Sequence, residues 1–121
     1  MSSKHRKKAD PRIKQWGTTS TGLRVWLVDG PIIRRDYDID FTEGGTHPRY
    51  SFIPEMEVWI ELEETVKERQ FVLLHELHER RLMCRGLGYE DAHQQSSIVE
   101  QNCRKNPGEL KQALEVEGWV S

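Results

Sequence analysis

The sequence predicts an α+β fold, in which a small, mostly antiparallel sheet in the N-terminal half is packed by two long helices and one short C-terminal helix. Apolar residues alternate with polar ones before about residue 63, which is the period of a half-buried strand. Beyond that point apolar residues recur every three to four positions, which is the period of a helix. Strands followed by helices are typical of helices packed on one face of a sheet.

The first 16 residues are predicted to be a disordered basic tail, and residues 17–121 a single domain. Basic side chains crowd residues 4–8, and like charges repel one another. We expect this tail to be dispensable for folding. A length of 121 residues fits one domain. The formal net charge of −2, and the lack of an apolar run near the roughly 20 residues that span a bilayer, argue against membrane and specific nucleic-acid partners.

A β-hairpin is expected first in the domain. Residues 23–28 are rich in strand formers, and Asp29-Gly30 followed by Pro31 marks a turn. Residues 32–34 should then begin the returning strand.

Three further segments before residue 63 are predicted as strands. Residues 37–41 alternate apolar side chains with aspartates, and residues 50–54 follow a glycine-containing loop at 43–48. Residues 57–62 alternate as well, which favours a strand with one face on the core and the other toward solvent or a cleft.

Helices account for the rest of the chain. A long helix is expected from about Thr65 to Arg85, where nearby glycines end it. A second helix should cover residues 90–104 and break at Asn106-Pro107-Gly108, and a short third one residues 109–116.

Cysteine usage indicates a reducing compartment. Cys84 and Cys103 have no paired spacing with other cysteines, so we interpret them as reduced core residues of a cytoplasmic protein. A single disulfide between them is the alternative.

The first long helix carries two polar residues inside an apolar stripe. At about 100° per residue, His75 and Glu79 fall between apolar neighbours such as Phe71 and Val72. They are four residues apart, so they stack on one helical face. A buried His and Glu must be satisfied, and a metal ion would satisfy both. The competing interpretation is an ordinary core histidine.

The second helix favours the metal. Ala92, Ser96, Val99 and Cys103 form its core stripe. His93 and Glu100 lie together beside that stripe, and a turn of a few residues joins the two helices. His93 should therefore approach His75 and Glu79. Two histidines and one carboxylate are a ligand set of catalytic zinc, Zn2+, with a position left for water.

The segment His75-Glu76-x-x-Glu79 resembles the HExxH helix of zincin metallopeptidases, most closely the gluzincin branch. The resemblance covers about residues 50–105. It implies a zincin-like fold, with His75, Glu79 and His93 as metal ligands and Glu76 as general base. It also implies that residues 57–61 form the strand whose edge binds a peptide or protein substrate. The second His of the family motif is Glu79 here, and the third ligand would be His where gluzincins use Glu.

Further residues have accessory assignments. Tyr89 and His47 are alternative donors to a developing oxyanion. His78, three residues from His75, offers a second ligand pairing. Residues 40–45 with 50–54 also resemble small proteins of phages and prophages.

Two functions follow as hypotheses. The first is a zinc-dependent hydrolase, a small metallopeptidase. The second is a non-catalytic, metal-stabilised domain that binds a protein partner through exposed tryptophans, with His78 or Glu100 as fourth ligand of a closed site. The candidate contact residues are Trp16, Trp59 and Trp119.

Overall fold

The computed structural model describes residues 8–120 and has a four-stranded sheet with helices on both faces. The elements are β1 (Arg12–Thr18), β2 (Arg24–Val28), α1 (Gly30–Asp36), β3 (Gly44–Thr46), β4 (Glu57–Glu61), α2 (Val66–Cys84), α3 (Tyr89–Lys105), a 3-10 turn (Pro107–Glu109) and α4 (Leu110–Val116). The predicted α+β class, with strands first, two long helices and a short C-terminal helix, is confirmed.

The sheet has the strand order β1-β2-β4-β3. The outer pairs β1–β2 and β3–β4 are antiparallel, whereas β2 and β4 pair in parallel. A parallel pair needs a crossover connection, and α1 lies in the chain between these two strands. The sheet is therefore mixed, with antiparallel pairs in the majority.

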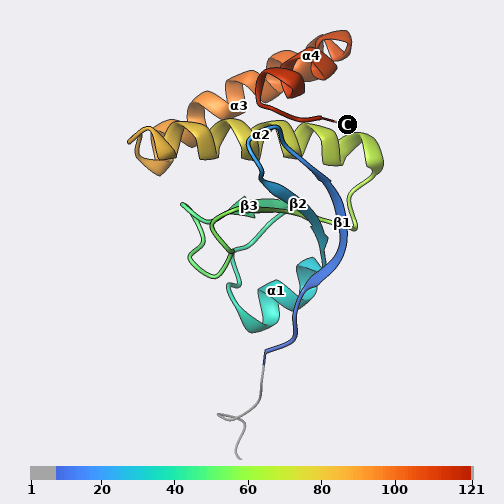
Figure 1. The fold of residues 1–121 in the computed structure, drawn as a ribbon, viewed down its shortest axis with the longest axis vertical. Coiled ribbons are helices and arrows are strands. Elements are labelled where there is room, and N and C mark those ends of the chain that lie inside the picture. The colour runs from blue at the N-terminus through green and yellow to red at the C-terminus, as the bar shows by residue number, and fades with distance from the viewer. Residues whose placement is uncertain (1–7, 121) are drawn as a thin grey trace, which may run out of the picture.

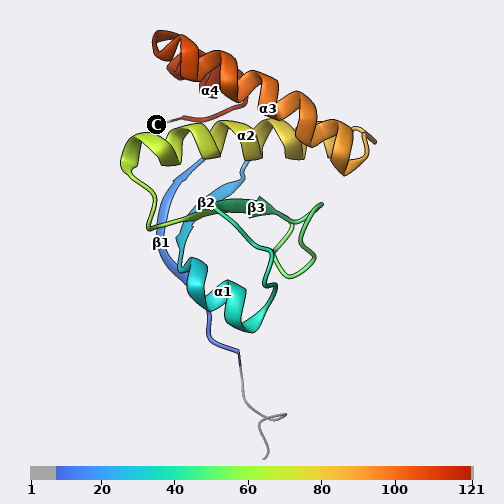
Figure 2. The same ribbon diagram turned by 180° about the vertical axis from the view of Figure 1, so that it is seen from behind.

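The helices form layers on the sheet. In Figures 1 and 2, α2 lies between the sheet and α3, while α1 lies on the opposite face of the sheet. One core, between the sheet and α2, contains Val58, Ile60 and Leu73; the other, beneath the sheet, contains Ile33 and Trp59. All five residues of β4 are buried, so the expectation that one face of this strand meets solvent or a cleft is wrong.

The expected hairpin after β2 is wrong, because the chain enters α1 instead. The Asp29 side chain caps this helix by accepting a hydrogen bond from the Ile32 backbone N–H, and Pro31 occupies its first turn. An aspartate cap followed by proline is a helix start signal as well as a turn signal.

The next two predicted strands are also wrong. Residues 37–41 and 50–54 form turns whose aromatic side chains, Tyr37, Phe41 and Tyr50, pack into the core beneath the sheet. The apolar residues of these turns are not all buried, since Ile39 is exposed, so the alternation at 37–41 did not mark a half-buried strand. The strand in this region is β3, inside the segment expected to be a loop.

The predicted helices after residue 63 are confirmed within a residue or two. Thr65 caps α2 by accepting from the Glu68 backbone N–H. Gly86, at φ +103°, adopts the left-handed conformation that ends helices, and α3 starts three residues later.

The predicted tail boundary at residue 16 is wrong at its C-terminal end, because β1 begins at Arg12. The Arg12 guanidinium is 3.0 Å from a carboxylate oxygen of buried Glu57. Removing residues 2–12 should therefore destabilise the fold. The basic residues 4–7 lie outside the described residues.

The tryptophans proposed as exposed partner contacts are not exposed. Trp59 and Trp119 are buried, and partly buried Trp16 packs edge-on against Trp119 with ring centroids 5.2 Å apart. Both cysteines are free, but only Cys103 is buried; Cys84, at the end of α2, is exposed, so its assignment to the core is wrong.

Candidate metal centre

Packing of α3 on α2 brings three potential metal ligands together. α2 is covered by the sheet on one side and by α3 on the other, and its residues 71–74 are apolar and buried. His75 and Glu79, one turn apart, are the two polar residues of this helix that are buried as well. The short connection after Cys84 reverses the chain, so that α3 presents His93 to them.

The three donor atoms form a nearly equilateral triangle. His75 Nε2 is 3.0 Å from Glu79 Oε2 and 3.1 Å from His93 Nδ1. The remaining side, from His93 Nδ1 to Glu79 Oε2, is 2.9 Å. The structure thus brings together the three residues that the sequence predicted as ligands.

The triangle fits a small divalent cation. Zinc bonds of about 2.0–2.1 Å in a tetrahedron set neighbouring donors about 3.3 Å apart, so these atoms need to separate by only a few tenths of an ångström. Glu79 is 2% and His75 7% exposed, whereas the His93 side chain is 48% exposed. The buried pair gives the site rigidity, and the exposed side leaves room for a fourth ligand from outside.

Glu100 contacts the far nitrogen of His75 and does not join the triangle. Its Oε1 is 2.9 Å from His75 Nδ1, and its Oε2 accepts from Arg104 Nε at 2.8 Å. Arg104 also pairs with Glu68 on α2. A carboxylate on the second ring nitrogen fixes the tautomer and orientation of a ligand histidine. Glu100 therefore contacts His75 on the ring nitrogen opposite the triangle, and it does not belong to the cluster of three donors that was to be closed by a fourth ligand.

Two carboxylates also control the charge of His75. Burial alone would lower the pKa of this imidazole, but the hydrogen bonds to Glu100 and Glu79 outweigh burial and raise it to about 10. In the metal-free protein both ring nitrogens of His75 are thus protonated at neutral pH, and the ring is positively charged. A metal ion would have to displace one of these protons, because only the neutral imidazole binds metal.

Glu76 lies on α2 next to His75, and its side chain is in contact with the sheet. A Cβ on Gly44 of β3 would lie 3.2 Å from Glu76 Cγ, so the side chain rests against this strand. Its carboxylate makes no hydrogen bond or ion pair with any residue between 8 and 120. Burial, and secondarily the negative charge of Glu79, raise the pKa of Glu76 to about 8.

β4 is a central strand of the sheet, and its neighbour β3 lies at the edge. The resemblance to zincins implied residues 57–61 as the substrate-binding edge, but β4 pairs with β2 on one side and with β3 on the other. β3 is one of the two edge strands, the other being β1, and it is the one that lies next to Glu76. The sequence could not reveal this, because β3 is three residues long and begins with two glycines, which are poor strand formers.

The predicted accessory residues lie in different places. His78 is paired with Glu117 at 2.8 Å and does not reach the triangle. His47 contacts the Ile53 carbonyl oxygen through Nδ1, in the turns beneath the sheet. Tyr89 does lie at the site, with its ring centroid 5.4 Å from that of His93. Sequence reasoning missed Arg49, whose guanidinium lies 4.5 Å from the Tyr89 ring centroid.

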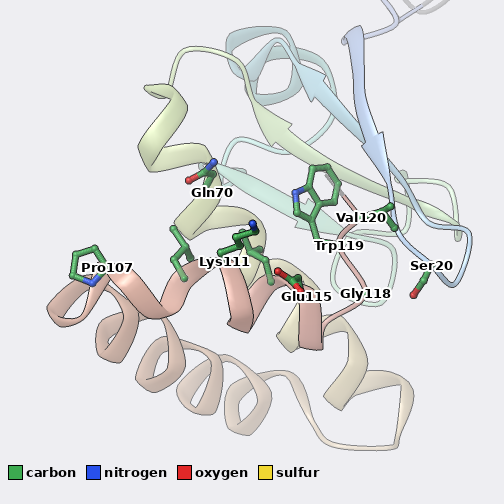
Figure 3. A pocket seen from close by; sticks show the side chains of 10 residues that line it. Ser20, Gln70, Pro107, Lys111, Glu115, Gly118, Trp119 and Val120 are labelled. Carbon is green, nitrogen blue, oxygen red and sulfur yellow. The ribbon is translucent and has the colours of Figure 1, made fainter.

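A separate pocket of about 680 Å³ lies between α4, the C-terminal segment and the start of α2 (Figure 3). Leu110, Leu114 and Trp119 are among its lining residues, and none of its lining belongs to the triangle. The chemistry-bearing residues therefore lie elsewhere.

Comparison of the chain with models of protein families, with curated proteins and with solved structures finds no match. Within the part of the chain that the structure describes, no helix combines the length and apolar character needed to cross a membrane.

Proposed function

We propose that this protein is a zinc-dependent hydrolase, a small metallopeptidase, with His75, Glu79 and His93 as metal ligands and Glu76 as general base. The observation that carries the proposal is the donor triangle, with sides of 2.9–3.1 Å, on a helix that also presents an unpaired carboxylate one residue from a ligand. Two nitrogen donors and one carboxylate suit zinc, and three protein ligands leave a coordination position open.

Each residue has a distinct part in the proposed reaction. When bound, zinc would polarise a substrate carbonyl and acidify a water molecule. Glu79 and the two histidines hold the ion, and Glu100 keeps His75 in the tautomer whose Nε2 faces it. The positive charge of a bound ion would lower the raised pKa of Glu76 and favour its ionised form. Ionised Glu76 would then accept a proton from the attacking water and return it to the leaving amine. Tyr89, beside His93, is the better placed of the two predicted oxyanion donors.

An extended peptide is the proposed substrate. β3 is an edge strand, and an edge strand can pair with an added peptide. The Gly44 N–H already donates to Thr42 and the Thr46 carbonyl already accepts from Arg49 and Tyr50, so only the remaining outward backbone groups of β3 are left for a peptide. Gly44 brings this edge close to Glu76, so a peptide lying along it would pass the general base. The free thiols of Cys84 and Cys103 support a cytoplasmic location as part of the proposal.

The alternative, a non-catalytic domain stabilised by a structural metal, has less support. Structural zinc sites are closed by four protein ligands, and the residues described supply three, with Glu100 turned to the other face of the His75 ring. The tryptophans that this alternative required are buried or packed.

The test compares the purified protein with Glu76→Gln. Both should bind about one zinc per chain by elemental analysis, but only the first should cleave a fluorogenic peptide mixture, because an amide cannot take the proton from water. Chelation with EDTA should abolish cleavage, and added zinc should restore it. Full zinc occupancy without cleavage of any peptide in the mixture would contradict the peptidase and favour the alternative.

A further inference from the structure

Arg49 lies beside Tyr89, the neighbour of His93, with its guanidinium stacked on two aromatic rings. It belongs to the turn that directly follows β3, where the backbone N–H groups of Arg49 and Tyr50 both donate to the Thr46 carbonyl. Its Cζ atom is 4.9 Å from the centroid of the Tyr50 ring and 4.5 Å from that of Tyr89. Contacts of this kind hold a cation in place without neutralising its charge.

The guanidinium is within reach of anything bound at the metal. Since Tyr89 is 5.4 Å from the His93 ring and 4.5 Å from Arg49 Cζ, the guanidinium lies at most about 10 Å from the His93 ring. An extended peptide advances about 3.3–3.6 Å per residue. A group no more than about three residues from the scissile bond would therefore meet Arg49.

Unlike most arginines in this fold, Arg49 has no acidic partner. Six others each have a carboxylate oxygen within 4.0 Å: Arg12, Arg24, Arg34, Arg35, Arg81 and Arg104. Arg49 makes no such pair with residues 8–120 and is exposed. The Tyr89 hydroxyl, as a hydrogen-bond acceptor, raises the pKa of the Arg49 guanidinium, and most of the five N–H donors of Arg49 are left for a ligand.

We propose that Arg49, positioned by Tyr50 and Tyr89, is a specificity-determining residue that binds a carboxylate of the peptide substrate. This inference rests on the proposed peptidase function. The planar fork of a guanidinium matches the two oxygens of a carboxylate. That carboxylate is either the C-terminus of a short peptide or an Asp or Glu side chain close to the scissile bond. The site therefore selects anionic peptides.

The test measures binding of four peptides to the zinc-loaded Glu76→Gln protein and to the metal-free unaltered protein by calorimetry. The first pair is N-acetyl-tetraalanine as free acid and as amide. The second is N-acetyl-Ala-Glu-Ala-Ala-amide and its Gln counterpart. We expect one acid to bind about tenfold more tightly than its neutral partner, the size of one charge-assisted bidentate contact. The pair that shows the preference identifies the source of the carboxylate.

Arginine variants assign the preference to a residue. Arg49→Gln should abolish it, and Arg49→Lys, which keeps the charge but loses the fork, should retain only part of it. Arg35 lies on α1, on the opposite face of the sheet from α2 and α3. Arg35→Gln removes the same charge and should leave the preference intact. A thermal melt of each variant establishes that it is folded.

The outcomes separate this inference from the peptidase proposal. Equal binding of acid and neutral peptides, binding of none of the four, or a preference that survives Arg49→Gln would overturn the carboxylate site, whether or not the protein cleaves peptides. An Arg49-dependent preference in a protein that cleaves nothing would support the carboxylate site and refute the peptidase.

Discussion

Glu79→Ala is the substitution that most directly tests the metal centre. The Glu79 carboxylate is 2% exposed, and one of its oxygens touches both histidines, at 3.0 and 2.9 Å. Truncation removes a direct ligand. Since even the loss of a residue that orients a ligand weakens metal binding about 10–100-fold, loss of the ligand itself should exceed about 100-fold.

The effect on the metal-free protein should be smaller. His75 keeps its hydrogen bond to Glu100, and half-exposed His93 can turn to water. The charge of Glu79 repels the Glu76 carboxylate and so raises the pKa of Glu76. Removal of Glu79 relieves this repulsion. The net cost should therefore fall below the usual cost of about 3–5 kcal/mol for a broken buried pair, at about 2 kcal/mol, or about 8 °C in the thermal midpoint.

The assay is a thermal melt with and without zinc. At a free zinc concentration 100 times the dissociation constant, the unaltered protein should gain about 2.7 kcal/mol, which for a domain of this size is about 10 °C. Glu79→Ala should show no zinc-dependent gain at that concentration. Glu76→Gln is the matched control, because it alters a carboxylate one helical turn away, and it should keep the full gain.

A normal zinc-dependent gain in Glu79→Ala would refute the ligand assignment. Loss of the gain in Glu76→Gln with retention in Glu79→Ala would mean that the two glutamates have exchanged roles, and the comparison with the zincin motif would fail.

Three further predictions follow from the same contacts. Glu100→Gln should weaken zinc binding by about 10–100-fold in a calorimetric titration without abolishing it, and unchanged affinity would remove Glu100 from its orienting role. The metal-free protein should lose stability as pH rises from 6.5 to about 10, because the folded state raises the pKa of His75 from 6.5 to about 10 and the stabilisation is complete only below 6.5. Denaturant melts of this protein and of His75→Gln across that pH window measure the part of the decline that is due to His75. A decline of the same size in both proteins would contradict the prediction. Gly44→Ala should destabilise the fold by about 1–3 kcal/mol, because the added Cβ would lie 2.9 Å from Val72 Cγ1, and a denaturant melt with an unchanged midpoint would show that β3 can move away from α2.

The helical half of the fold could be predicted from the sequence because its signals are local. Thr65 caps α2, Gly86 ends it, and the stripe through Ala92 and Cys103 sets the rotation of α3. Once both rotations are known, the meeting of His75, Glu79 and His93 follows. The cluster of these three side chains was predictable for the same reason.

The strands and the outer parts of the site could not be predicted as well, because they depend on contacts distant in the sequence. Gly44 and Gly45 form a strand only because β4 offers them a partner. The position of Arg49 depends on its contact with Tyr89, 40 positions later in the sequence. The contact of Glu100 with the far ring nitrogen of His75 depends on the orientation of the Glu100 side chain. The start of α1 was different, since the cap at Asp29 and the proline after it were present in the sequence and were interpreted as a turn.

The α2–α3 pair has a consequence for the order in which the molecule assembles. The three donor residues His75, Glu79 and His93 are at most 18 positions apart in the sequence, so bringing them together closes only a short loop. Such contacts form early, whereas the parallel pairing of β2 with β4 spans 33 positions and is intrinsically slower. Under the proposed function, a helical hairpin would bind zinc before any sheet exists. Glu76 would meet Gly44 only later, when β3 pairs with β4, so a nascent chain of the proposed hydrolase would hold zinc before its general base was in place.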